Sequence, residues 1–225
     1  MKIQEPVLKS VERWSSKDSL AKEREVTGFY VTDHPLRKFD IEYKSFATIH
    51  LGETEDKEIE NARACGVITD LKTKIDKSGR AMAFFTLDDF SGSCECLMFS
   101  KVYEKYGKYV KEEDCVFIVG NTESSGDAIK LHINEVIPLK EAKDKFTESV
   151  KLFFEKNKHT PDTISRLQEI FNKHKGKLPV YLHFFNNGFK PRCFQLKNIR
   201  VKISDEFVKE VVAVLGEDSI LLSSK

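Results

Sequence analysis

Four cations and one aromatic side chain lie close together in the middle of the chain, and their types suit contact with a single nucleic-acid strand. The polar segment from Leu71 to Ala81 holds the cations against a single carboxylate, Asp76. Lysine and arginine side chains bind phosphate oxygens, and an exposed aromatic ring stacks on a base. A solvated basic loop without a ligand is the competing interpretation. The predicted site consists of Lys72, Lys74, Lys77, Arg80 and Phe84.

The segment that follows alternates so that two neighbouring phenylalanines fall on opposite faces of one strand. Side chains two residues apart in a strand share a face. The all-apolar set is Ala83, Phe85 and Leu87, and the mixed set is Phe84, Thr86 and Asp88. We therefore expect Phe85 in the core and Phe84 on the outer face. Asp88, Asp89 and Glu95, expected near that outer face, would repel phosphate and favour weak binding.

The sequence shows no arrangement typical of an active site. It has no Walker loop, no G-x-S-x-G, no HExxH and no Rossmann fingerprint. Asp88 and Asp89 are adjacent, so in a strand their side chains would point to opposite faces and could not easily share a metal. The six histidines are scattered along the chain. We expect no enzyme activity from this chain alone.

Cysteine usage and hydropathy favour a cytoplasmic protein without a metal or cofactor. The five cysteines are odd in number and mostly lie in apolar runs, which is typical of reduced, buried thiols. Cys94 and Cys96 form a C-x-C, but no second pair or nearby histidine completes a zinc site. No apolar run approaches the roughly 18 residues that a membrane span needs. Residues 1–10 have no signal-peptide core.

The order of elements in residues 61–138 predicts a five-stranded OB-fold β-barrel. Three strands, a helix and a two-stranded hairpin follow one another, which is the order of that fold. The predicted strands are Ala62 to Leu71, Met82 to Asp88, Cys94 to Phe99, Cys115 to Val119 and Ile129 to Ile137, and the helical spacing falls on Val102, Tyr103, Tyr106 and Tyr109.

The flanking parts are predicted as a partly helical N-terminal segment, 1–60, and a small C-terminal α+β domain, 139–225. The first has a charged helix from Ser16 to Val26, a turn at His34-Pro35 and an acidic linker from Gly52 to Glu60. The second starts with a charged stretch and follows a strand-helix-strand-strand-helix-strand order of split βαβ type, although Glu148 to Phe154 also fits a helix. It carries 17 Lys/Arg against 11 Asp/Glu.

Local signals place the elements of the C-terminal part. Thr160-Pro161 starts its first helix and Gly176 is expected to stop it. Asn187-Gly188 predicts a hairpin turn. Ser204 is expected to cap the second helix and Gly216 to end it. A last strand is possible at Ile220 to Leu222.

Two motifs make the chain resemble a known family. Gly28-Phe29-Tyr30 followed by His34-Pro35-Leu36 resembles the G-F-Y-x-x-x-H-P-L segment of the alpha subunit of bacterial DNA polymerase III, the C-family replicative polymerase. The run from Lys77 to Glu95 is similar to the K-x-G-x-x-M-A-F-x-T-L-x-D-x-x-G-x-x-E core of that family's OB-fold. Phe99 and Tyr103 match the F-x-x-x-Y that follows.

The resemblance implies a non-catalytic C-terminal part of such a polymerase. The family's catalytic aspartates lie in an upstream palm domain, and its Q-x-x-[LM]-F clamp-binding motif has no counterpart here, since Gln4 is followed by Glu5-Pro6-Val7-Leu8. The chain is therefore expected to begin after that motif. The OB-fold would then bind single-stranded template DNA, and residues 139–225 would contact the clamp-loader tau subunit.

Two other functions stay open. Anticodon-binding domains of class II aminoacyl-tRNA synthetases carry a similar L-x-D-x-x-G, so the barrel could be an RNA-binding module of that type. Residues 139–225 are too short for the catalytic domain that should then follow. The barrel could also be a structural or protein-interaction domain with no nucleic-acid ligand, which would share every core feature.

Overall fold

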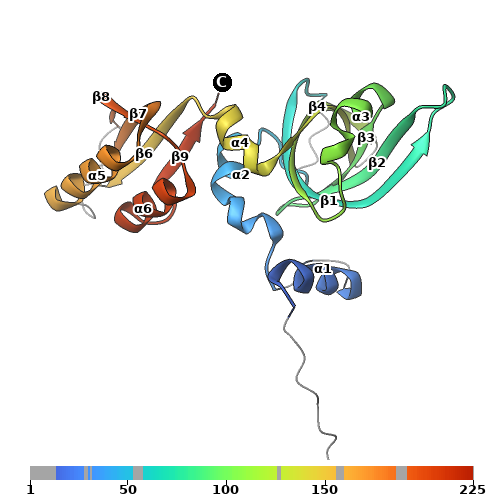
Figure 1. The fold of residues 1–225 in the computed structure, drawn as a ribbon, viewed down its shortest axis with the longest axis horizontal. Helices are drawn as coiled ribbons and strands as arrows, with labels where there is room; N and C mark the ends of the chain where they lie inside the picture. Colours follow the sequence, from blue (N-terminus) through green and yellow to red (C-terminus); the bar gives the residue numbers. More distant parts are fainter. Residues whose placement is uncertain are drawn as a thin grey trace, which may run out of the picture.

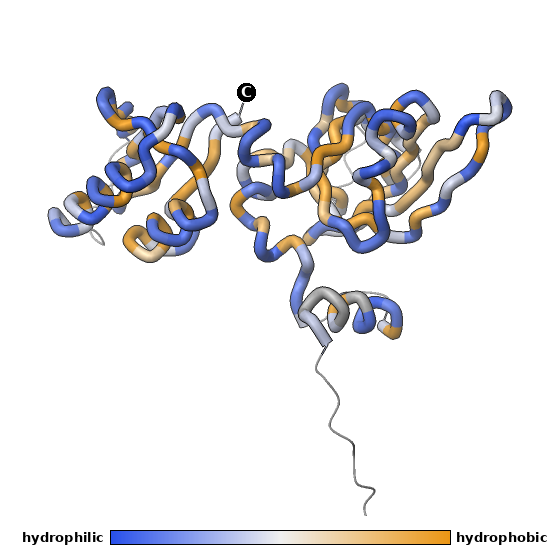
Figure 2. Tube along the Cα trace, in the orientation of Figure 1, coloured by the Kyte–Doolittle hydropathy of each residue, from blue (hydrophilic) through white to orange (hydrophobic). Residues whose placement is uncertain are grey.

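Two β-sheet units lie side by side in the computed structural model, with helices between and below them (Figure 1). The structure describes residues 14–27, 30, 32–52, 58–125, 128–155, 160–185 and 192–224. Figure 2 shows that apolar residues concentrate along the strands of both units. The helices between the two sheets contact both of them and thereby determine how the two units are positioned.

The first unit is a closed barrel of five strands in the order β1-β2-β3-β5-β4, which confirms the predicted OB-fold. Its strands are β1 (Ala62–Ile75), β2 (Ala81–Asp88), β3 (Ser93–Met98), β4 (Cys115–Ser125) and β5 (Ala128–Pro138). Neighbouring strands are antiparallel except β3 and β5, which pair in parallel. The helix α3 (Ser100–Tyr106) and a 3-10 turn, η2 (Gly107–Tyr109), connect β3 to β4, as the tyrosine spacing predicts.

Strand β1 is longer than the sequence predicts, because polar residues continue the pairing past the barrel wall. Lys72 pairs with Phe84 and Lys74 with Met82, so both lysines stand on a strand rather than in a loop. A bulge lies between Thr69 and Lys72, and Asp70 there has a positive φ of 53°. Backbone pairing needs no apolar side chains, which is why hydrophobic alternation misses this extension. The β1–β2 hairpin therefore projects from the barrel (Figure 1).

The second unit is a four-stranded sheet in the order β8-β7-β6-β9 with two helices on one face. Its elements are β6 (Ser149–Glu155), α5 (Pro161–Lys173), β7 (Lys175–Phe185), β8 (Arg192–Val201), α6 (Asp205–Leu215) and β9 (Ile220–Ser223). This βαββαβ order confirms the predicted fold class. The split arrangement is wrong, however, because β6 and β7 pair directly and in parallel, with no strand between them.

The helix ends in this unit follow local chemistry, with one exception. Thr160 and Thr163 form a capping box at the start of α5, and the Ser204 hydroxyl accepts a hydrogen bond from the Phe207 N–H at 3.1 Å. Gly216 ends α6 with a φ of 94°. Gly176, in contrast, lies within β7, where a Cβ would come within 2.4 Å of the Lys202 nitrogen. It is needed for close strand approach rather than to stop α5. The predicted Asn187-Gly188 turn lies outside the described residues.

The N-terminal segment contains the predicted helix and one that the sequence analysis missed. Helix α1 (Ser16–Thr27) matches the prediction. His34 does not simply mark a turn, because its Nδ1 accepts the Leu36 N–H and caps η1 (Pro35–Phe39), with Pro35 at the first helical position. Helix α2 (Asp40–Phe46) continues from there. Residues 28, 29 and 31 of the family motif and 53–57 of the expected linker lie outside the described part.

Helices α2 and α4 (Leu139–Phe146) lie between the two sheets and share one core with both (Figure 1). The charged stretch expected after residue 139 thus forms an amphipathic helix. Phe46, Phe117 and Phe146 meet with ring centroids 5.5 to 6.1 Å apart. These rings come from α2, β4 and α4. One apolar cluster therefore runs from the outside of the barrel wall to the second sheet, and the barrel interior forms a separate cluster.

A buried ion pair accompanies this aromatic contact. The Lys143 ammonium lies 3.0 Å from the buried Glu42 carboxylate and 2.6 Å from Asp205 at the start of α6. Burial alone would lower the pKa of Lys143, but hydrogen bonds to Asp205 and Glu42 outweigh it and raise the pKa. The Ser45 hydroxyl also accepts the Leu222 N–H of β9 at 3.0 Å. Helix α2 is thereby fixed to the second sheet by polar as well as apolar contacts.

This shared core predicts that the two units unfold together. Phe46→Ala removes a ring that is fully buried between them, so it should lower the free energy of unfolding by about 3–5 kcal/mol. Urea denaturation followed by circular dichroism should show one transition, displaced as a whole. The control Ile75→Ala, at a side chain 66% exposed, should change stability by less than about 0.5 kcal/mol. Two transitions of which only one moves would contradict the shared core.

Candidate nucleic-acid interface

Asp76 organises the loop at the tip of the β1–β2 hairpin. Its Oδ1 accepts the backbone N–H groups of Ser78 and Arg80 at 2.8 and 2.9 Å, and its Oδ2 accepts the Ser100 hydroxyl at 2.7 Å. The Arg80 N–H and the Ser100 hydroxyl are the main causes that lower the pKa of Asp76 to about 2. The Arg80 guanidinium also pairs with this carboxylate at 3.3 Å. The positive charge of Arg80 is therefore partly neutralised. The other three predicted cations, Lys72, Lys74 and Lys77, are uncommitted in the sense that they form no ion pair among the described residues.

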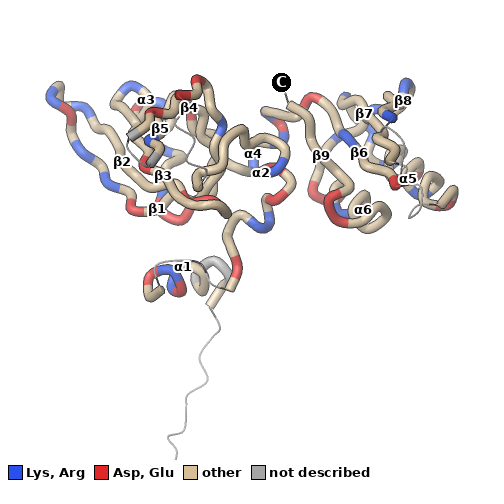
Figure 3. The backbone as a smooth tube through the Cα atoms, turned by 180° about the vertical axis from the view of Figure 1, so that it is seen from behind, with Lys and Arg blue, Asp and Glu red and all other residues tan. Residues whose placement is uncertain are grey.

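Lys72 and Lys74 stand on the same face of β1 as the Phe84 ring on β2. Lys72 is the cross-strand partner of Phe84, and the Lys74 ammonium lies 5.1 Å from the ring centroid, a cation–π contact. Phe84 is partly exposed, whereas Phe85 is 3% exposed and belongs to the barrel core. The predicted inside and outside faces of β2 are thus confirmed. Figure 3 shows the cations along this hairpin.

The strand register extends this face across the barrel. Phe84 is opposite Leu97 on β3, and Leu97 is opposite His132 on β5. The ring of Phe99, 49% exposed, lies 5.8 Å from that of His132. We call this set the outer barrel surface. Its members are Lys72, Lys74, Lys77, Phe84, Leu97, Phe99 and His132.

Sequence reasoning missed Leu97, Phe99 and His132. The period of two along β3 could have placed Leu97 and Phe99 on one face. His132 could not have been found in this way, because only the parallel pairing of β3 with β5 brings it to Leu97. Its Nε2 also contacts the Glu123 carboxylate at 2.5 Å.

The three carboxylates expected to repel phosphate do not form an exposed acidic cluster. Asp89 is buried, and its Oδ2 accepts the Tyr43 hydroxyl and the Leu51 N–H, each at 3.0 Å. Its expected place near the outer face is wrong, because it anchors the segment after α2 to the barrel. Asp88 lies 3.1 Å from the Arg24 guanidinium. Glu95 is exposed and pairs with Lys130 at 3.2 Å.

Burial raises the pKa of Asp88, against the lowering effect of a hydrogen bond from Thr69 and the charge of Arg24. The Thr69 hydroxyl donates to this carboxylate at 3.0 Å. Asp88 therefore serves to hold α1 against the barrel. The carboxylates near the outer barrel surface are thus Glu95, paired with Lys130, and Glu123, in contact with His132.

Neither a cluster of metal ligands nor a membrane-spanning helix is present among the described residues. In them, no three His, Cys, Asp or Glu side chains gather closely enough to hold a metal ion. No helix in this part of the chain is long and apolar enough to cross a membrane. The arrangement on the barrel suits binding of a polyanion with exposed bases.

Comparisons with known proteins agree with this geometry. Residues 62–139 match a family model described as tRNA_anti-codon, OB-fold nucleic acid binding domain. The DNA polymerase III subunit alpha of Pseudomonas aeruginosa is 25% identical over 217 residues, which cover 96% of this chain and 18% of that protein. That of Halalkalibacterium halodurans is 26% identical over 230 residues, covering 100% of this chain and 20% of the relative. The expected resemblance is confirmed, and the chain spans about a fifth of these relatives' length.

Among solved structures, the second OB-fold domain of replication protein A from Methanococcus maripaludis matches with 13% sequence identity and a TM-score of 0.25. The match covers 34% of this chain and 80% of that chain. A likeness at this level carries no argument about function.

The two faces of β2 predict opposite outcomes for neighbouring substitutions. Phe85→Ala empties part of the barrel core and should cost about 3–5 kcal/mol of unfolding free energy. Phe84→Ala removes a partly exposed ring and its cation–π contact, and should cost about 1 kcal/mol. Urea denaturation of the two variants and the parent chain measures the difference. Equal costs would mean that Phe84 is a core residue and is not available to a ligand.

Proposed function

We propose that this chain is a non-catalytic part of a replicative DNA polymerase alpha subunit whose outer barrel surface binds single-stranded template DNA weakly. The observation that carries the proposal is the continuous cross-strand row from Lys72 through Phe84 and Leu97 to His132. It joins phosphate-binding and base-stacking groups on one exposed face. A primer-extension assay tests whether the chain alone is non-catalytic, and it should yield no product.

The chemistry of the row matches that of a single strand. Lysines neutralise phosphates as mobile point charges, and aromatic rings stack on unpaired bases without regard to sequence. Lys74 already lies over the Phe84 ring, so a base stacking there must displace or share that ammonium. With only three uncommitted lysines, the affinity should be low and strongly dependent on salt.

The tRNA_anti-codon family model also fits an RNA-binding module. The resemblance to the polymerase alpha subunit covers both motifs and almost the whole chain, and therefore favours DNA. Competition between single-stranded DNA and RNA of the same sequence separates the two ligands. A barrel that binds neither would be structural.

The three uncommitted lysines give a quantitative test. Replacing Lys72, Lys74 and Lys77 with Gln should lower the melting temperature only slightly, because all three side chains are exposed and only the Lys74–Phe84 cation–π contact is lost. For the parent, log affinity should fall with log salt at a slope of about −2, at about −0.7 per neutralised phosphate. For the variant the slope should approach zero. Fluorescence anisotropy with labelled oligothymidylate measures both.

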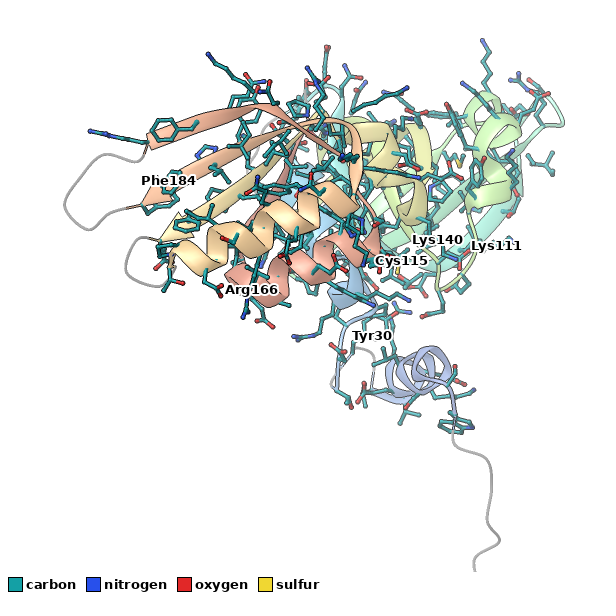
Figure 4. All side chains as sticks on the ribbon, turned by 60° about the vertical axis from the view of Figure 1, so that its left-hand side comes forward. Tyr30, Lys111, Cys115, Lys140, Arg166 and Phe184 are labelled. Atoms are coloured by element: carbon teal, nitrogen blue, oxygen red, sulfur yellow. The ribbon has the colours of Figure 1, made fainter. Side chains whose placement is uncertain are left out.

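A matched control removes the same charge elsewhere. The exposed residues Lys111, Lys140 and Lys209, of which the first two are labelled in Figure 4, should be replaceable by Gln without loss of binding. Phe84→Ala should weaken binding by about 1–3 kcal/mol if the ring stacks on a base. Equal loss in the control triple variant would mean that binding depends on net charge and not on this surface.

We also propose that residues 139–225 contact a protein, which the resemblance identifies as the clamp-loader tau subunit. Two large apolar side chains, Ile164 on α5 and Phe194 on β8, are each 50% exposed. The register of Phe194 with Leu182 puts it on the side of the sheet that α5 and α6 cover. Exposed apolar side chains on that side suit a protein contact.

Substitution tests this contact better than deletion, because removing 139–225 would take Phe146 out of the shared core. Ile164→Asp combined with Phe194→Asp should abolish capture of purified tau by the full chain. The lysine-to-glutamine triple variant of the barrel should retain it. If the apolar variant still captured tau while the barrel variant did not, the two surfaces would have the reverse roles.

A further inference from the structure

The second sheet has a face that its helices do not cover. Along β6, Val150, Leu152 and Phe154 point toward α5 and α6 and are buried, so Lys151 and Phe153 point the other way. Figure 4 shows both helices on one side of this sheet. The uncovered side is therefore made of the alternate residues of each strand.

Aromatic rings gather on this uncovered side. The register places Tyr181 opposite Lys151 and His183 opposite Phe153. The Phe153 ring centroid lies 5.4 Å from that of His183 and 5.8 Å from that of Phe185, which is 40% exposed. We call this set the open sheet face. Its members are Lys151, Phe153, Tyr181, His183, Phe185, Cys193 and Gln195.

The strands that form this face carry far more positive than negative charge. Residues 170–204, which include β7 and the edge strand β8, contain eight Lys/Arg and no Asp/Glu. Lys197 and Arg200 are exposed on β8, whereas the exposed Arg192 is opposite Phe184 and therefore stands on the helix-covered side. Of the eight, Lys173 pairs with Glu206 and Glu210 across α5 and α6, and Lys190 lies outside the described residues.

A pocket of about 590 Å³ lies between α5 and the β8 edge, on the helix-covered side of the sheet. Its lining includes the cations Lys175, Lys197 and Arg200 and the side-chain amides of Gln168 and Asn172, without a carboxylate among the described lining residues. The Arg200 guanidinium donates to the Lys177 carbonyl at 3.0 Å, which fixes its direction at this edge. The β8 edge is therefore basic on the helix-covered side as well as beside the open sheet face.

We propose that the open sheet face is a second binding surface for single-stranded DNA, with bases stacked on Phe153, His183 and Phe185. Lys151 and the cations of the β8 edge bind the phosphates. The proposal goes beyond the barrel site and does not depend on it, because no residue is shared.

Charge complementarity favours nucleic acid over a protein partner on this face. Residues 170–204 hold cations without carboxylates, which favours a polyanion over a protein of ordinary composition, because each cation that meets a phosphate releases a counterion. Aromatic residues on the uncovered face of a four-stranded sheet stack two or three unpaired bases in other nucleic-acid-binding modules. Burial, aided by the nearby Lys151 charge, lowers the pKa of His183. The carboxylate on this face, Glu155, lies at the end of β6 beside Phe185, away from Arg200.

Cys193 offers a direct probe, because its exposed Sγ lies 3.4 Å from His183 Nε2 on the open sheet face. Alkylation by N-ethylmaleimide, followed by mass spectrometry, should slow at Cys193 in proportion to the bound fraction when oligothymidylate is added. The less exposed Cys115, on β4, serves as an internal reference and should react at an unchanged rate. The full chain is used, in the parent form and with the barrel lysines replaced by Gln.

The two chain forms and a matched pair of aromatic variants decide the outcome. Phe185→Ala, on the open sheet face, should raise the DNA concentration needed to protect Cys193 by about 5- to 150-fold, as expected for the loss of 1–3 kcal/mol of stacking. Phe194→Ala, at a ring 50% exposed on the other side, should leave it unchanged. If protection disappears in the variant with the barrel lysines replaced by Gln, DNA held on the barrel is what covers Cys193. If Cys193 is not protected at a saturating concentration of oligothymidylate, the proposed second binding surface is wrong.

Discussion

Contact between three aromatic rings joins the two halves of this molecule. Phe46, Phe117 and Phe146 come from α2, β4 and α4, and they belong to an apolar cluster that runs from the outside of the barrel wall to the second sheet, while the barrel interior is a separate cluster. The buried Glu42–Lys143 pair and its extension to Asp205 lie in the same region. A buried pair of this kind is weak evidence for stability, but losing one partner would leave an uncompensated charge. It therefore favours one arrangement of α2, α4 and α6 over others.

The proposed binding surfaces follow from what these cores bury. In β2, burial of Ala83, Phe85 and Leu87 forces Phe84 outward, next to Lys72 and Lys74. In β6, burial of Leu152 and Phe154 forces Phe153 outward in the same way. Both surfaces combine exposed aromatic rings with cations on neighbouring strands, and both lie on units whose relative position the shared aromatic core determines.

Period-two alternation and turn chemistry predict most of this fold, because barrel strands and helix caps depend on neighbouring residues. Helix α2 was missed because its seven residues contain only two inward-facing rings, Tyr43 and Phe46, and its support comes from distant elements. The composition of the candidate site also depends on contacts that pattern reasoning did not include. The parallel β3–β5 contact brings His132 to Leu97, the turn around Asp76 partly neutralises Arg80, and Asp89 is buried by partners from residues 43 to 51. The β3–β5 contact and the partners of Asp89 leave no local pattern in the sequence, whereas the Asp76–Arg80 pair is local and its four-residue spacing could have revealed it.

The most direct test of the central claim is ultraviolet crosslinking of oligothymidylate to the full chain, with the attached peptides identified by mass spectrometry. If the outer barrel surface holds the strand, adducts should form on Phe84, Phe99 or His132, and they should be lost at high salt together with binding. Adducts confined to peptides outside the barrel, or none at a concentration that saturates binding, would contradict the assignment of the barrel as a single-strand-binding module.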